Sequence, residues 1–182
     1  MKVSRIYTDV NHYQYFLGEK DEDEIALLTD GTSRKDSWSP PSVYIYKDKL
    51  IPGNFLGFHG DSLILNPQAT KVLSSFLSEA GELLPLPYKG EVYTLLNVTQ
   101  CISCLDAEET EWSTMSNGLR LYPRKYVFNP KLFAKSRIFK IPETRGAEVL
   151  VVDLEKGDEE ELLDCISKNN LKGLIFEELW HD

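Results

Sequence analysis

The sequence has no long apolar run. No segment approaches the roughly 20 consecutive apolar residues that a membrane-spanning helix requires. The start, Met1–Arg5 followed closely by Asp9, is too polar for the core of a signal peptide. We therefore expect a cytoplasmic protein without a membrane partner.

Basic residues are outnumbered by acidic ones. The chain has 20 Lys and Arg against 29 Asp and Glu, which gives a formal net charge of -9. A protein that grips nucleic acid needs Lys and Arg to displace the counterions of the phosphates, so we expect no nucleic-acid partner. The charge favours a basic protein partner through long-range attraction, although solubility alone explains it equally well.

Cysteine is scarce as well. The three cysteines, an odd number, are most simply free thiols of a reducing compartment. Cys101 and Cys104 have the spacing of a redox pair or of half a zinc site. On a strand, however, residues three positions apart point to opposite faces. The other zinc ligands would have to come from Cys165 and three scattered histidines, so we expect neither a metal nor another cofactor.

Catalytic motifs are also missing. The sequence contains no GxSxG, HExxH, P-loop or dinucleotide-binding pattern. His59 lies in the glycine-flanked turn 57–61 and is a candidate general base beside Asp61, but a lone histidine in a turn is most often a surface residue. We assign no catalytic residue. A hydrolase-like enzyme that uses His59 and nearby acids stays open as an alternative.

The composition that is present is that of an ordinary folded domain. Hydrophobic residues make up 42% and charged residues 27% of the 182 positions. A chain of this length buries roughly 70% of its unfolded surface and needs no disulfide or metal to fold. We expect a single domain, 1–182, with a small β-rich lobe at residues 1–60 as an open alternative.

One segment, 66–81, has the signals of a helix with both ends marked. Asn66 suits the N-cap, and Pro67 suits the first helical position because its missing N–H is unpaired there in any case. Apolar residues then recur at helical spacing. We expect Gly81 to supply a left-handed C-terminal cap.

A second helix is predicted at 158–169, where Asp158 and Glu161 have the spacing of a capping box and Asn169–Asn170 ends the pattern. A turn at Lys89–Gly90 precedes a strand whose pairing could extend through 105. The predicted strands are 43–46, 91–98, 136–141, 148–153 and 171–179. These elements predict an α+β fold with a mainly antiparallel or mixed sheet and two principal helices.

The acidic, polar segment 107–117 is interpreted as a loop. Its acids lack the glycine-containing spacing of calcium loops, so it is either a solvated loop or a docking patch for a basic partner. Trp112 favours docking, since tryptophan is enriched at interface hot spots, whereas Trp38 and Trp180 are expected to pack on the core. The candidate partner-binding residues are Asp106, Glu108, Glu109, Glu111 and Trp112.

Several motifs follow one another over about residues 60 to 180. They are a helix after an Asn start, a proline-rich stretch, a YxLLNV…LD pattern, an FKI-type strand and a terminal GLxFxxL segment. Their positions are 66–81, 84–87, 93–98, 104–106, 138–141 and 173–179. In this order they resemble a family of bacterial immunity proteins found beside polymorphic secreted toxins.

The resemblance implies a non-catalytic binding protein that neutralises a cognate toxin by occluding or locking it. It implies no catalytic residues. The acidic charge would suit a toxin with a basic cleft. Besides the hydrolase-like enzyme, a self-associating scaffold protein is the other alternative, and the sequence leaves the oligomeric state undetermined.

Overall fold

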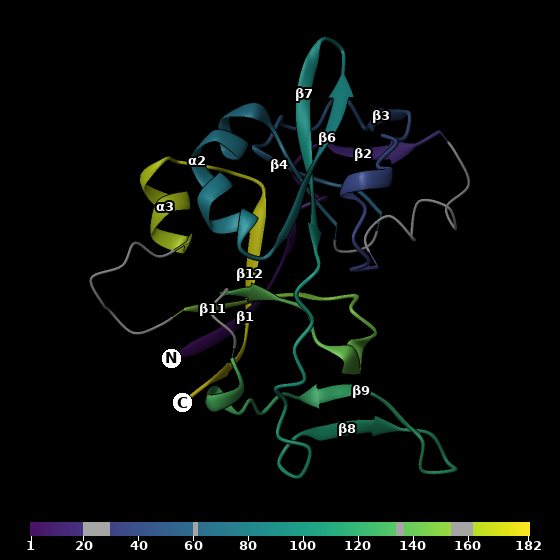
Figure 1. Cartoon of the computed structure of the whole chain (residues 1–182), viewed down its shortest axis with the longest axis vertical. Coiled ribbons are helices and arrows are strands. Elements are labelled where there is room, and N and C mark those ends of the chain that lie inside the picture. The colour runs from purple at the N-terminus through teal and green to yellow at the C-terminus, as the bar shows by residue number, and fades with distance from the viewer. Residues whose placement is uncertain (20–29, 60–61, 134–136, 154–161) are drawn as a thin grey trace.

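The structure, a computed structural model, describes residues 1–19, 30–59, 62–133, 137–153 and 162–182. Within these residues the strands form three sheets, and the two described α-helices lie together beside them (Figure 1). Most strand pairs are antiparallel and one is parallel, so the predicted α+β fold with a mixed sheet is confirmed.

The four-stranded sheet has the order β10-β11-β1-β12 and is antiparallel throughout. Its strands are β1 (Lys2–Thr8), β10 (Ile138–Phe139), β11 (Val149–Asp153) and β12 (Leu174–His181). The strand nearest the N-terminus therefore lies between two strands from the C-terminal third. Residue 136 of the predicted strand 136–141 lies outside the described residues, and within 137–141 the strand covers 138–139. The strand predicted at 171–179 starts and ends later.

The six-stranded sheet has the order β3-β2-β4-β5-β7-β6. Its strands are β2 (Tyr15–Gly18), β3 (Val43–Tyr46), β4 (Phe55–Gly57), β5 (Leu63–Leu65), β6 (Gly81–Tyr88) and β7 (Glu91–Val98). The predicted turn at Lys89–Gly90 is confirmed, because both residues have positive φ, as a tight hairpin requires. Residues 1–60 thus contribute strands to both large sheets.

Helix α2 (Pro67–Ser78) begins as predicted, because the Asn66 side chain accepts a hydrogen bond from the Ala69 backbone N–H at 2.9 Å. The prediction for its end is wrong. The helix stops at Ser78, and Gly81 has no left-handed conformation but opens strand β6. A Cβ at Gly81 would lie 2.0 Å from the Asn97 carbonyl oxygen, so close strand packing explains this glycine.

Helix α3 (Leu162–Lys168) is the described part of the second predicted helix. Asp158 and Glu161, the predicted capping box, lie outside the described residues. The predicted end at Asn169–Asn170 is confirmed by the positive φ of Asn170. Neither described helix is long and apolar enough to cross a membrane.

The segment after β7 differs from the prediction in two ways. The strand pairing of β7 does not continue to residue 105. Between 99 and 105 the described pairing consists of isolated bridges, which join Cys101 to Lys140 and Leu105 to Phe128. The predicted loop 107–117 contains a strand, β8 (Glu111–Thr114), which pairs with β9 (Arg120–Lys125). These two strands form the third sheet, at the end of the molecule opposite the β6–β7 turn (Figure 1).

Three apolar clusters hold the described elements together. The first joins α2 and α3 to both large sheets, the second covers the other face of the six-stranded sheet, and the third packs the segments around 101–105 and 126–133 on the four-stranded sheet. Trp38 closes over the second cluster, where its indole N–H donates to the Pro85 carbonyl at 2.7 Å. Trp180 packs on the third cluster against Phe128. Both tryptophans lie against the core, as expected.

The described residues also include short 3-10 turns at Lys35–Ser37 (η2), Pro130–Leu132 (η3) and Pro142–Thr144 (η4).

Candidate functional site

The β8–β9 hairpin is the element that brings the candidate residues together. Its turn is closed by Gly118, which has a φ of 83° and donates its backbone N–H to the Met115 carbonyl at 2.9 Å. The Asn117 side chain accepts from the Leu119 N–H at 3.1 Å. Asn-Gly is a strong short-range signal for a hairpin, and it is the signal in the sequence that indicates this pair of strands.

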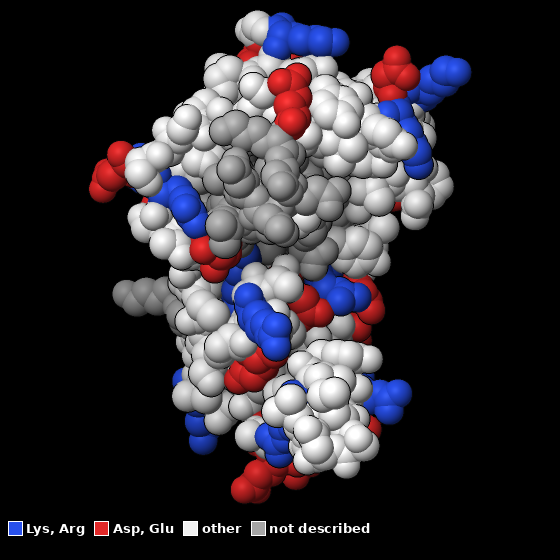
Figure 2. Space-filling model, turned by 90° about the vertical axis from the view of Figure 1, so that its right-hand side faces the viewer, with Lys and Arg blue, Asp and Glu red and all other residues white. Residues whose placement is uncertain are grey.

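The hairpin exposes large apolar side chains near its turn and along β9. Their exposed fractions are 49% for Met115, 58% for Leu119, 47% for Leu121 and 55% for Tyr122. Figure 2 looks onto this end from the side to which the turn points, and an uncharged surface rimmed by charges occupies the lower part of the view. Contiguous exposed apolar surface with a polar rim is typical of protein interaction sites.

The predicted acidic residues surround the base of the hairpin, but they do not behave alike. The Asp106 carboxylate accepts the backbone N–H groups of Glu108 and Glu109 at 3.0 and 3.1 Å and so stabilises the turn. Glu108 and Glu109 are exposed. Glu111, on β8, forms an exposed ion pair with Lys125 at 3.4 Å. Glu108 and Glu109 are therefore the acids with the most freedom to meet a partner.

Trp112 is half-buried on β8. The Arg120 guanidinium lies 5.1 Å from the centre of its ring, across the hairpin. Among the described residues, its indole N–H has no hydrogen-bond partner, and the nitrogen is out of reach of solvent. The polar edge of Trp112 at its indole nitrogen is thus turned away from solvent.

A groove of about 800 Å³ lies beside the hairpin, and sequence reasoning did not anticipate it. Consecutive residues of β9 and its extension, 121–126, form one wall. The turn around η4 (143–148) and the strand β12 (177–179) form the other, with Arg5 of β1 between them. Four segments that are far apart in the sequence build this groove, so no local pattern could indicate it.

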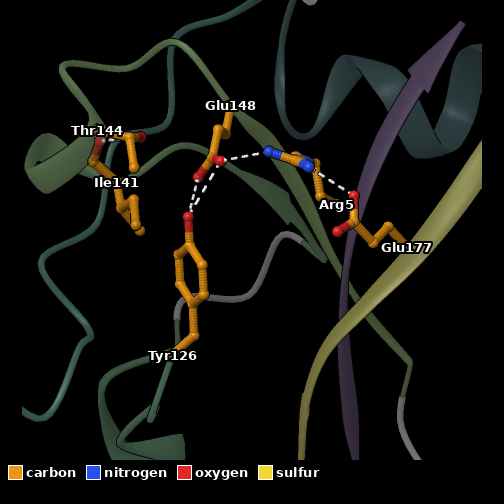
Figure 3. A network of polar contacts seen from close by, with 6 residues as sticks. All are labelled: Arg5, Tyr126, Ile141, Thr144, Glu148 and Glu177. Carbon is orange, nitrogen blue, oxygen red and sulfur yellow. Dashed lines mark hydrogen bonds and ion pairs between the residues drawn. The ribbon is translucent and has the colours of Figure 1, made fainter. Parts of the chain in front are cut away.

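Arg5 is the centre of a polar network inside the groove (Figure 3). It donates to the Glu148 carboxylate at 2.8 Å and to Glu177, its direct cross-strand neighbour on β12. Burial alone would lower the pKa of Arg5, but the hydrogen bonds to Glu177 and Glu148 outweigh it and raise that pKa. The guanidinium therefore stays charged and holds β1, β12 and the start of β11 together.

Tyr126 extends the network to the hairpin. Its hydroxyl donates to Glu148, with oxygen distances of 2.8 and 3.0 Å. Burial and this bond raise the pKa of the Tyr126 phenol, so the hydroxyl remains a donor at neutral pH. Nearby, Thr144 donates to the Ile141 carbonyl at 3.4 Å and closes the η4 turn. The network fixes the base of the hairpin against the four-stranded sheet.

The cysteine and histidine candidates lie apart from the groove. Cys101 is exposed, whereas Cys104 is buried in the third apolar cluster, and burial raises the pKa of its thiol to about 12. That thiol stays protonated, which is unsuited to redox chemistry. The His59 carbonyl accepts from the Ser62 hydroxyl at 2.6 Å, and Asp61, its predicted partner, is outside the described residues. Within the described part of the chain, no three His, Cys, Asp or Glu side chains gather as a metal site would need.

Comparison with known proteins adds no assignment. No protein-family model matches the chain, and the search of curated proteins gives no significant match.

Proposed function

We propose that the protein is a non-catalytic, cytoplasmic binding protein that neutralises a cognate bacterial toxin by direct contact. The β8–β9 hairpin carries the proposal, because it exposes Met115, Leu119, Leu121 and Tyr122 at one end of the molecule. Exposed aromatic and aliphatic side chains of this kind form the centres of protein interfaces. We choose a toxin as the partner because the order of the sequence motifs resembles that of immunity proteins.

The polar surroundings of the hairpin support a basic partner. Glu108 and Glu109 are exposed beside it, and the chain as a whole carries a formal charge of -9. A negative field of this kind raises the rate of encounter with a positively charged protein. A basic cleft of a nucleic-acid-processing toxin has that charge, and it would accept an inserted hairpin.

The network around Arg5 also supports binding by a preformed surface. The Tyr126–Glu148 and Arg5–Glu148 bonds hold the base of the hairpin in place before a partner arrives. A surface that is already ordered loses less conformational entropy on association, which favours a slow dissociation rate.

The proposal is tested by capture and rescue. The tagged protein is used to capture partners from the lysate of its native organism, and bound proteins are washed at rising salt and identified by mass spectrometry. We expect one tightly held protein that is toxic when expressed alone and harmless when co-expressed with this chain. A captured protein without toxicity, or toxicity without rescue, would overturn the immunity function.

The contribution of Glu108 and Glu109 to binding is tested separately with the same partner. In the variant E108Q/E109Q, we expect weaker binding and a smaller loss of affinity with added salt, because two rim charges are removed without loss of volume. E79Q, which removes an exposed charge at the end of α2, is the control. Unchanged affinity and unchanged salt dependence would remove the acids from the contact surface.

A further inference from the structure

The acids that line the groove are already bound to partners within the chain. Glu148 accepts from Arg5 and Tyr126, and Glu177 accepts from Arg5. Glu178 pairs with His181 at 2.9 Å. These carboxylates therefore have hydrogen-bond partners inside the molecule, and Arg5 offsets part of their negative charge.

Glu143, the remaining acid of the lining, does not face the open space with both oxygens. Its Oε1 atom accepts from the Ser103 hydroxyl at 3.3 Å, and its Oε2 atom is out of reach of solvent. A hydrogen bond from a neutral hydroxyl does not cancel the Glu143 charge, so the cations of the groove must outweigh it where an anion binds.

Two arginines of the same groove are in the opposite situation. Arg124, on β9, and Arg145, after η4, are exposed and line the groove from its two walls. In the described ranges of the chain, neither side chain has an ion pair or a hydrogen bond. Lys125 adds a third positive charge, and its exposed pair with Glu111 is of the kind that contributes little.

The backbone conformation at Arg145 fixes the position from which its side chain extends. Its φ is 56°, in the left-handed region that disfavours residues with a Cβ. The turn is held by hydrogen bonds from the N–H of Arg145 to the Pro142 carbonyl at 2.9 Å and from the N–H of Gly146 to the Ile141 carbonyl at 3.1 Å. An arginine at this position is thus directed from a rigid turn.

The β9 wall of the groove, which also carries Arg124, is partly apolar. Leu121, Tyr122 and Pro123 of β9 line it, and Leu179 faces them from β12. The volume of about 800 Å³ is within the range of sites for small organic molecules. Guanidinium groups next to apolar and aromatic side chains match a ligand that has an anionic group on an apolar body.

We infer that the groove between β9, η4 and β12 binds an anionic oxygen group, a carboxylate or a phosphate, attached to an apolar or aromatic body. Arg124 and Arg145 hold the anion, and Leu121 and Tyr122 contact the body. The net charge of the chain opposes anions only weakly here, because charges beyond about 8 Å are largely screened at physiological salt. The inference does not depend on the proposed toxin partner.

Titration of the isotopically labelled whole chain tests this inference. Benzoate, phenyl phosphate and inorganic phosphate are added separately at constant ionic strength, and backbone and arginine side-chain NMR signals are followed. We expect saturable shifts within 121–126, 143–148 and 177–179. Phenyl phosphate should bind more tightly than inorganic phosphate, because only the former fills the apolar wall.

The variant R124Q/R145Q should weaken the binding of phenyl phosphate by about tenfold or more, since hydrogen bonds to charged groups are lost. K71Q/K89Q, which removes two exposed positive charges outside the groove, is the matched control and should bind like the unaltered protein. Melting temperatures of both variants report whether they fold. Shifts that do not saturate, equal affinity for phenyl phosphate and inorganic phosphate, or equal binding by R124Q/R145Q and the unaltered protein would overturn the inference.

Discussion

At the scale of single residues, Arg5 and Glu82 show how few polar side chains position long segments. Arg5, on β1, bonds to β12 and to Glu148, which directly precedes β11 and also binds Tyr126 at the base of the hairpin. Glu82, at the start of β6, accepts from the Ser33 hydroxyl at 2.6 Å, the Arg34 N–H at 2.8 Å and the Asn97 amide at 3.0 Å. One carboxylate thereby holds the segment around residues 32–35 against the six-stranded sheet.

Removal of Arg5 should cost more stability than removal of the Tyr126 hydroxyl. R5M leaves Glu148 as a buried charge without its cation, and we expect a loss of about 3 kcal/mol in the free energy of unfolding. Y126F removes one donor while Arg5 still compensates Glu148, so the expected loss is about 1 kcal/mol. Urea denaturation measures both values, and a reversed order would contradict the central place of Arg5.

The pH dependence of stability should reveal how much the Glu82 charge contributes to folding. Burial alone would raise the pKa of Glu82, but the bonds from Ser33, Arg34 and Asn97 lower it from 4.5 to about 2. A folded-state pKa below the unfolded value gives stability that is complete above the unfolded pKa and is lost as the pH falls through the folded pKa.

The difference in unfolding free energy between the unaltered protein and E82Q should therefore shrink as the pH falls from about 5 to about 2. Denaturation series at several pH values measure it. E79Q, a neighbouring exposed acid at the end of α2, serves as the control and should show no such trend. A difference that stays constant over this interval would show that the Glu82 charge does not contribute to folding.

At the scale of elements, the predictable parts are those whose signals lie within the element. Asn66 and Pro67 mark the start of α2, and the turn at Lys89–Gly90 marks the start of β7, which spans 91–98 as predicted. The strand β8 was missed because it is short and mostly polar, and none of its residues is fully buried. Its Asn117–Gly118 turn was the available signal.

The residues of the candidate site also divide into those with a local sequence signal and those without one. The acids and Trp112 could be singled out from the sequence because they are neighbours in the chain. The groove could not, because Arg5, 121–126, 143–148 and 177–179 meet only through the pairing of β1 with β11 and β12 and the packing of the hairpin. Contacts between distant segments leave no local pattern.

The corrected role of Gly81 gives a prediction for the β6–β7 pair. G81A places a methyl group 2.0 Å from the Asn97 carbonyl oxygen, so the paired strands must separate, and we expect a loss of about 3 kcal/mol or more. G90A meets no atom within 4 Å and is opposed only by its φ of 86°, which should cost about 1 kcal/mol. Urea denaturation of both variants compares them. Equal losses would contradict close packing against β7 as the reason for glycine at position 81.

At the scale of the whole molecule, the two large sheets and the helices form a body from which the β8–β9 hairpin extends at one end (Figure 1). The hairpin and the groove are continuous, since Leu121 and Tyr122 belong to the exposed apolar surface and also line the groove. A protein that covers the hairpin would therefore also cover the mouth of the groove, and an anion bound there would affect its fit.

The most direct measurement is the dissociation constant of the captured partner for L119S/Y122S, with I51S as the control. Ile51 is a 61% exposed apolar residue outside the hairpin and its groove. We predict that L119S/Y122S weakens binding by about tenfold or more, as loss of interface hot spots does, and abolishes rescue, whereas I51S leaves both unchanged. Equal affinity of L119S/Y122S and the unaltered protein would contradict the assignment of the hairpin as the binding surface.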